Sequence, residues 1–253
     1  MKKKIVLLTI IGLLICTTAF ALPINPFNTR SIDIGAPPSG ELSVQQILDS
    51  NWGTNVVNAI TGQQSAGMWG SSSMLYPSTI PTIIYEGAGL AGNNTVGIWS
   101  GTDTDSITKY KIFLGAADAG TVASLSWDIS GNLTIAGTPV KVNNISGVAG
   151  INPFSFGFYL DRAPIEGYPA VTYYTVDQLN GNTPQAVAYN LPNSDTWKIF
   201  FEDLPYNNGG TRDFNDFVFR TESIRAVPEP ATMLLLGSGL IGLAGFARRR
   251  FKK

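Results

Sequence analysis

Short runs of apolar and aromatic residues, separated by Gly, Asn, Asp and Pro, make up most of the chain after residue 79. In the run 107–114, Thr, Tyr, Ile and Leu alternate with Lys109 and Lys111. A period of two is typical of a strand with one face in water. Runs of this kind predict ten strands, at 82–86, 95–100, 107–114, 123–129, 132–137, 154–160, 171–176, 185–190, 197–203 and 216–221.

The regular spacing of these runs, with turn residues between them, predicts an all-β fold, an antiparallel β-sandwich or jelly-roll-like domain over residues 79–226. Residues 22–78 form an N-terminal lead-in. Within it, Ser43 and Gln46 have capping-box spacing, so we expect a short helix over 42–53. Residues 61–79 are small and polar, and fit a linker, a long loop or an irregular sheet edge.

The N-terminus has the three parts of a secretory signal peptide. Three lysines precede an apolar segment, and Ala19 and Ala21 form a small-x-small cleavage site. Cleavage after Ala21 would remove residues 1–21. The alternative is a lipoprotein signal acylated at Cys16, which requires a small residue just before the cysteine, where this chain has Ile15.

The C-terminal residues combine a short motif, an apolar run and a basic end. The motif is Val227, Pro228, Glu229 and Pro230, the uncharged run is 231–247, and the basic tail begins with Arg248, Arg249 and Arg250. At about 1.5 Å per residue, a helix over this run is roughly 25 Å long, close to the thickness of a bilayer's hydrocarbon core. The positive-inside rule keeps the basic tail in the cytoplasm and places the preceding domain outside.

This order of motif, transmembrane helix and basic tail over residues 227–253 resembles the PEP-CTERM sorting signal of Gram-negative bacteria. The resemblance implies processing near the motif by exosortase, a membrane cysteine transpeptidase-like enzyme. It also implies passage through an inner-membrane intermediate to the cell surface or an exopolysaccharide matrix. We therefore expect the tail to be a label that is removed, with retention as a single-pass membrane anchor as the alternative.

Without its two ends, the chain is acidic and lacks most catalytic side chains. Residues 22–226 hold seventeen carboxylates and nine basic residues, a net charge of about −8, which argues against nucleic acid and anionic lipid as partners. The only cysteine is Cys16, and there is no histidine. Disulfides, Ser-His-Asp or Cys-His catalysis, and the usual zinc, haem or copper ligands are therefore excluded from residues 22–226.

The stretch 197–220 gathers five oxygen-bearing side chains at the ends of two predicted strands. They are Glu202 and Asp203 before a Gly-rich loop, and Asp213, Asn215 and Asp216 after it. A hairpin would bring them together. Because calcium takes six to eight oxygen ligands, these five side chains are candidate ligands of a Ca²⁺ site. The alternative is turn capping, for which Asp and Asn are common, and the spacing does not fit the EF-hand pattern.

The same stretch resembles the closing signature of domain of unknown function 4114, a family of secreted bacterial domains. A Phe-Glu-Asp-Leu element at 201–204 and an Asp-Phe-Asn-Asp-Phe-Val-Phe element at 213–219 match that signature. The resemblance covers about residues 110–221. It implies a β-rich extracellular domain without an established activity.

Together these patterns predict an exported, non-enzymatic surface or extracellular-matrix protein that is associated with exopolysaccharide. The alternative is a glycoside hydrolase that uses acidic residues of the 202–216 hairpin, because two carboxylates suffice for that reaction. Aromatic side chains are candidates for stacking on sugars, although aromatics on strands more commonly pack in the core. These are Trp52, Trp69, Trp99, Tyr173 and Tyr174.

Overall fold

The computed structural model describes residues 23–28, 31–87, 92, 94–115, 117–205 and 211–227. The predicted signal peptide at 1–21, with Ala19 and Ala21, lies outside this range. So do Pro228, Glu229 and Pro230, the predicted transmembrane helix at 231–247, and Arg248, Arg249 and Arg250. Within the described ranges, no helix is both long and apolar enough to cross a membrane.

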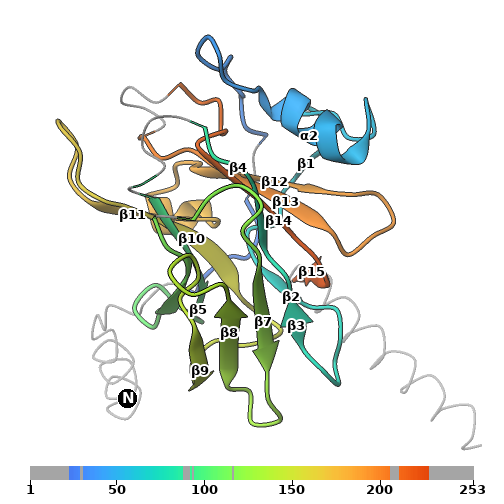
Figure 1. Ribbon diagram of the computed structural model, residues 1–253, viewed down its shortest axis with the longest axis vertical. Coiled ribbons are helices and arrows are strands. Elements are labelled where there is room, and N and C mark those ends of the chain that lie inside the picture. The colour runs from blue at the N-terminus through green and yellow to red at the C-terminus, as the bar shows by residue number, and fades with distance from the viewer. Residues whose placement is uncertain are drawn as a thin grey trace, which may run out of the picture.

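The fold is mostly β, with antiparallel sheets (Figure 1). All ten predicted strands are present, together with five further short ones. The strands are β1 Gln63–Gln64, β2 Trp69–Ser71, β3 Ser78–Thr79, β4 Thr82–Tyr85, β5 Asn94–Ser100, β6 Thr108–Phe113, β7 Ala123–Trp127, β8 Leu133–Gly137, β9 Ile145–Val148, β10 Gly157–Arg162, β11 Val171–Tyr174, β12 Ala186–Asn190, β13 Trp197–Phe201, β14 Phe217–Thr221 and β15 Ile224–Ala226. The described helices are α2, Val44–Trp52, and a short 3₁₀ helix, η2, Asp177–Asn180.

The strands form four antiparallel sheets around a common core. One sheet has the order β1-β12-β13-β14-β4, a second β11-β10-β5-β6, a third β3-β7-β8-β9, and β15 pairs with β2. Side chains from all four sheets meet in the largest apolar cluster, for example Trp69, Ile98, Leu125, Phe158 and Phe201. Strands β1 and β2 precede residue 79 and β3 includes it, and all three pair with strands that follow it, so the packing crosses that position.

The three central strands of the five-stranded sheet are buried on both faces. Along β12, β13 and β14, alternate residues face the common core: Ala186, Ala188, Ile199, Phe201, Phe217 and Phe219. The intervening residues form a second cluster with helix α2: Val187, Tyr189, Phe200 and Val218. Burial on both faces explains why apolar residues follow one another along these strands instead of alternating with polar residues.

Helix α2 begins and packs as the sequence predicts. The hydroxyl of Ser43 accepts a hydrogen bond from the backbone N–H of Gln46, whose side chain accepts one from the N–H of Ser43, so the capping box is formed. Its buried face, Val44, Ile47 and Leu48, lies on the second cluster. A lysine adds a polar link, since the fully buried Lys198 of β13 donates from Nζ to the carbonyl oxygen of Ile47 at 2.7 Å.

Candidate metal centre

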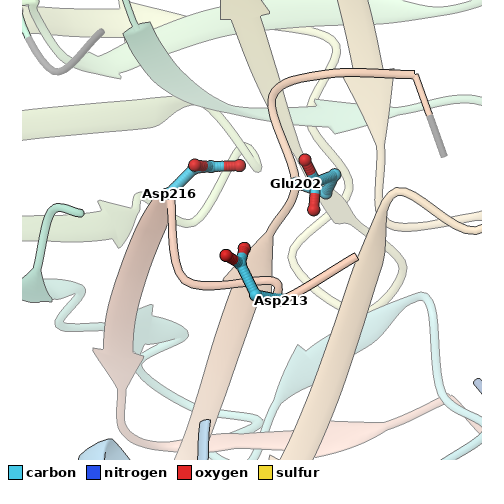
Figure 2. Close-up of side chains that lie close together, drawn as sticks. All are labelled: Glu202, Asp213 and Asp216. Carbon is cyan, nitrogen blue, oxygen red and sulfur yellow. The ribbon is translucent and has the colours of Figure 1, made fainter. Parts of the chain in front are cut away.

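The β13–β14 hairpin brings three carboxylates together at one end of the five-stranded sheet. Glu202 directly follows β13, and Asp213 and Asp216 precede β14. Three carboxylate oxygens, one from each residue, all lie within 4.8 Å of one another. The side chains point toward a common space (Figure 2). All three residues are buried, with exposed fractions of 1%, 2% and 6%. Two oxygens on one calcium ion lie no more than about 5 Å apart, so the spacing fits a single ion.

The backbone between Asp213 and its neighbours adopts an unusual conformation. Arg212 and Phe214 both have positive φ angles, 60° and 51°. A residue other than glycine pays about 1–3 kcal/mol for such a conformation, which persists where the surroundings hold it and is common at ligand-binding loops. Phe214 is fully buried in the cluster beneath α2. The packing of Phe214 therefore holds the turn that carries Asp213 into the site.

Asp203 is not one of the three clustered carboxylates, and both Asp203 and Asn215 make hydrogen bonds to other parts of the chain. Asp203 accepts a 2.8 Å hydrogen bond at Oδ2 from the side-chain amide of Asn94, the first residue of β5. Its backbone N–H donates to Oδ2 of Asp216 at 2.8 Å. Asn215 donates from Nδ2 to the carbonyl oxygen of Leu42 at 2.9 Å and to the carboxylate of Glu41 at 3.2 Å.

Asn94 and Glu41 are parts of this site that the sequence did not indicate. They are more than 100 residues away from the hairpin along the chain, and neither belongs to a recognisable spacing. Only the fold brings them to it. The sequence could have indicated Asn94 only as a polar residue directly before an apolar strand, and polar residues are common at strand ends.

Burial raises the pKa of every carboxyl group in the hairpin. The pKa of Glu202 is raised to about 7 by burial and then by the charges of Asp213 and Asp203. The pKa of Asp216 is raised to about 9 by burial and then by Asp203 and Glu202. Burial also raises the pKa values of Asp203 and Asp213, an effect that hydrogen bonding by Asn94 and the charge of Arg162 partly offset at Asp203. The cluster therefore needs a compensating positive charge in order to be fully ionised near neutral pH.

Four buried oxygens around the cluster accept no hydrogen bond from the described part of the chain. They are Oε2 of Glu202, Oδ1 of Asp213, Oδ1 of Asn215 and Oδ1 of Asn94. A buried acceptor without a partner costs about 1–3 kcal/mol. Turn capping accounts for Oδ2 of Asp216, which accepts the N–H of Asp203. It does not account for these four oxygens, and carboxylate and amide oxygens are the ligand type that a hard cation takes.

The candidate sugar-stacking aromatics are mostly in the interior. Trp69 and Trp99 are fully buried, and Tyr173 is 7% exposed. Trp52 and Tyr174 are partly buried against apolar clusters. Trp69 and Trp99 are therefore core residues, the role that aromatics on strands more commonly have.

Comparison with protein families identifies the C-terminal segment. Residues 226–250 match the PEP-CTERM protein-sorting motif. The predicted PEP-CTERM signal is confirmed. This motif is recognised by exosortase and marks an exported protein of Gram-negative bacteria that is processed at the membrane.

Two further comparisons find no match to the chain. No curated protein and no solved structure matches it. The resemblance of residues 110–221 to domain of unknown function 4114 finds no support in these comparisons.

The motif match begins directly at the folded body of the protein. Strand β15 ends at Ala226. Val227 still donates its backbone N–H to the carbonyl oxygen of Met68 at 3.2 Å, and its side chain packs on the apolar cluster that contains Met68 and Trp99.

Proposed function

We propose that this is a non-enzymatic extracellular protein in which Glu202, Asp213 and Asp216 bind one Ca²⁺ ion that stabilises the fold. Asn215 and Asp203 complete or support the ligand set from the same hairpin. The observation that carries the proposal is the convergence of three buried carboxylates, with four nearby acceptor oxygens that have no donor among the residues that the structure describes. The ligands are all oxygen atoms, which is the donor set that calcium prefers.

The choice of calcium over a transition metal rests on the chemistry of these ligands. There is no histidine in the chain, and its single cysteine, Cys16, lies in the predicted signal peptide. Zinc and copper sites in proteins are usually built from those two residue types. Magnesium remains a competitor, but it requires a compact octahedral shell and usually keeps several waters, which suits a buried, side-chain-rich site less well.

A calorimetric titration of the full-length chain in detergent, after removal of metals with a chelator, tests the proposal. We expect one Ca²⁺ per chain, with weaker binding of Mg²⁺, and no binding by the isosteric double variant Asp213→Asn/Asp216→Asn. A wild-type chain that gives no binding heat, and retains no calcium after dialysis, would show that these side chains only cap the turn.

The alternative of a glycoside hydrolase has weaker support. Hydrolysis requires that two carboxyl groups contact a sugar, with separations of about 5–9.5 Å. The hairpin carboxylates are almost completely buried, and a polysaccharide cannot reach them without rearrangement of the hairpin.

We also propose that the sheets form a β-sandwich of the jelly-roll type, which the common core between them supports. The proposed destination is the cell surface or an exopolysaccharide matrix. Support for this destination comes from the sorting motif.

A further inference from the structure

The segment 211–216 carries two of the three clustered carboxylates, and the N-terminal part of the domain also rests on it. The backbone N–H of Gly35 donates to the carbonyl oxygen of Arg212 at 2.8 Å. The two backbones approach so closely here that a Cβ atom on Gly35 would lie 2.2 Å from the carbonyl oxygen of Thr211. The chain before helix α2 is therefore fitted against the segment that holds Asp213.

A second contact joins the start of helix α2 to the same segment. Asn215 donates from its side-chain amide to the carbonyl oxygen of Leu42 and to the carboxylate of Glu41. Both residues directly precede Ser43, the N-cap of α2. The position of Asn215 thus helps to fix where the helix begins.

A third contact is apolar. Phe214 lies between Asp213 and Asn215 in the chain and is fully buried with Ile47 and Leu48 of α2. Consecutive residues of one turn therefore reach two different places, the carboxylate cluster and the helix. A shift of this turn moves both.

Electrostatics connects the position of this turn to a bound ion. Three carboxylates within 4.8 Å of one another repel when they are ionised without a counter-ion. A cation between them attracts all three carboxylates, which offsets this repulsion and favours a position of the 211–216 segment close to Glu202.

We infer that calcium binding at the hairpin locks residues 31–62, the α2 layer, onto the five-stranded sheet. The inference rests on the proposed calcium site and assigns it a regulatory role. When the ion leaves, the contacts at Gly35, Glu41 and Phe214 weaken together. The face of the sheet that α2 covers, with Val187, Tyr189 and Phe200, then becomes accessible.

Hydrogen–deuterium exchange of the full-length chain in detergent tests the inference. We expect the amides of 43–62 to exchange at least tenfold more slowly in calcium than in chelator. The amides of β8, which lies in the sheet β3-β7-β8-β9, provide the internal control and should change much less. An equal effect of calcium on both regions, or no effect on 43–62, would overturn the inference.

The coupling is reciprocal, so it can also be tested from the side of the helix. Leu48→Ala removes a buried contact of the α2 layer without touching a carboxylate, and we expect it to weaken calcium binding several-fold. Val176→Ala is the matched control, because Val176 is equally buried in a separate cluster, and its calcium affinity should equal that of the wild type. An unchanged affinity in Leu48→Ala would show that the layer and the site are independent.

Failure of the inference is distinguishable from failure of the proposed function. A wild-type chain that binds no calcium overturns both. A chain that binds calcium while the hydrogen exchange of residues 43–62 stays the same overturns only the inference that calcium holds the α2 layer onto the sheet.

Discussion

Removal of calcium should lower the thermal stability of the protein by an amount that the site's chemistry predicts. A ligand that binds only the native state, at one hundred times its dissociation constant, stabilises that state by about 2.7 kcal/mol. For a domain of this size each kcal/mol corresponds to about 2–4 °C. We therefore expect the unfolding midpoint in excess calcium to exceed that in chelator by about 5–11 °C.

The double variant Asp213→Asn/Asp216→Asn distinguishes the effect of losing the ion from the effect of disturbing the fold. It keeps the shape of both side chains, removes two of the three clustered charges, and should show the same midpoint in calcium and in chelator. In chelator it should be more stable than the wild type, because burial of like charges destabilises the native state.

Differential scanning calorimetry or far-UV circular dichroism on the full-length chain measures these midpoints. The control is Asp103→Asn/Asp105→Asn, which changes a pair of acids in an exposed turn. This variant should show the same difference in unfolding midpoint between calcium and chelator as the wild type. Equal midpoints for the wild type in calcium and in chelator would refute the reasoning. So would loss of the shift in the control variant, since binding would then lie elsewhere.

Three further outcomes follow from other parts of the structure. Burial lowers the pKa of Lys198 to about 7, so between about pH 7 and 10.5 this amine is neutral in the folded protein and takes up a proton on unfolding. Its contribution to the free energy of unfolding therefore rises with pH in that window. Denaturant unfolding in calcium should show that Lys198→Met removes this rise. Gly97→Ala would place a Cβ atom 2.3 Å from the ring of Tyr159 and should cost about 1–3 kcal/mol in the same assay; an unchanged midpoint would mean that β5 can shift freely. The intact mass of protein extracted from the cell surface should lack residues 231–253, and a mass that includes them would favour the retained anchor.

The longer strands could be predicted because their apolar residues recur with a regular period. Strands β1 and β3 were missed because each has two residues and consists of Gln, Ser or Thr. Such segments carry no periodicity, and they pair only because neighbouring strands offer free edges. The open interpretation of 61–79 is settled by the structure as an irregular edge, in which three short strands are separated by loops.

The acidic hairpin was predictable as a hairpin, but the distribution of its side chains was not. Successive residues after a strand point in different directions, so sequence could not decide whether Glu202 or Asp203 faces Asp216. Nor could spacing show that Phe214, inside the acidic motif, belongs to the packing of a helix more than 150 residues earlier in the chain. These contacts depend on tertiary structure, which local patterns do not contain.

The folded body of this protein reaches the sorting motif without a stalk. Val227 is still hydrogen-bonded to the domain, and only three residues separate it from the apolar run at 231–247. Four peptide steps extend at most about 14 Å, less than the radius of gyration of about 17 Å expected for a domain of this size. While that run lies in the bilayer, as the sequence predicts, the domain is held against the outer surface of the membrane. An enzyme that reads the motif must therefore fit around the domain surface near Met68 and Val227.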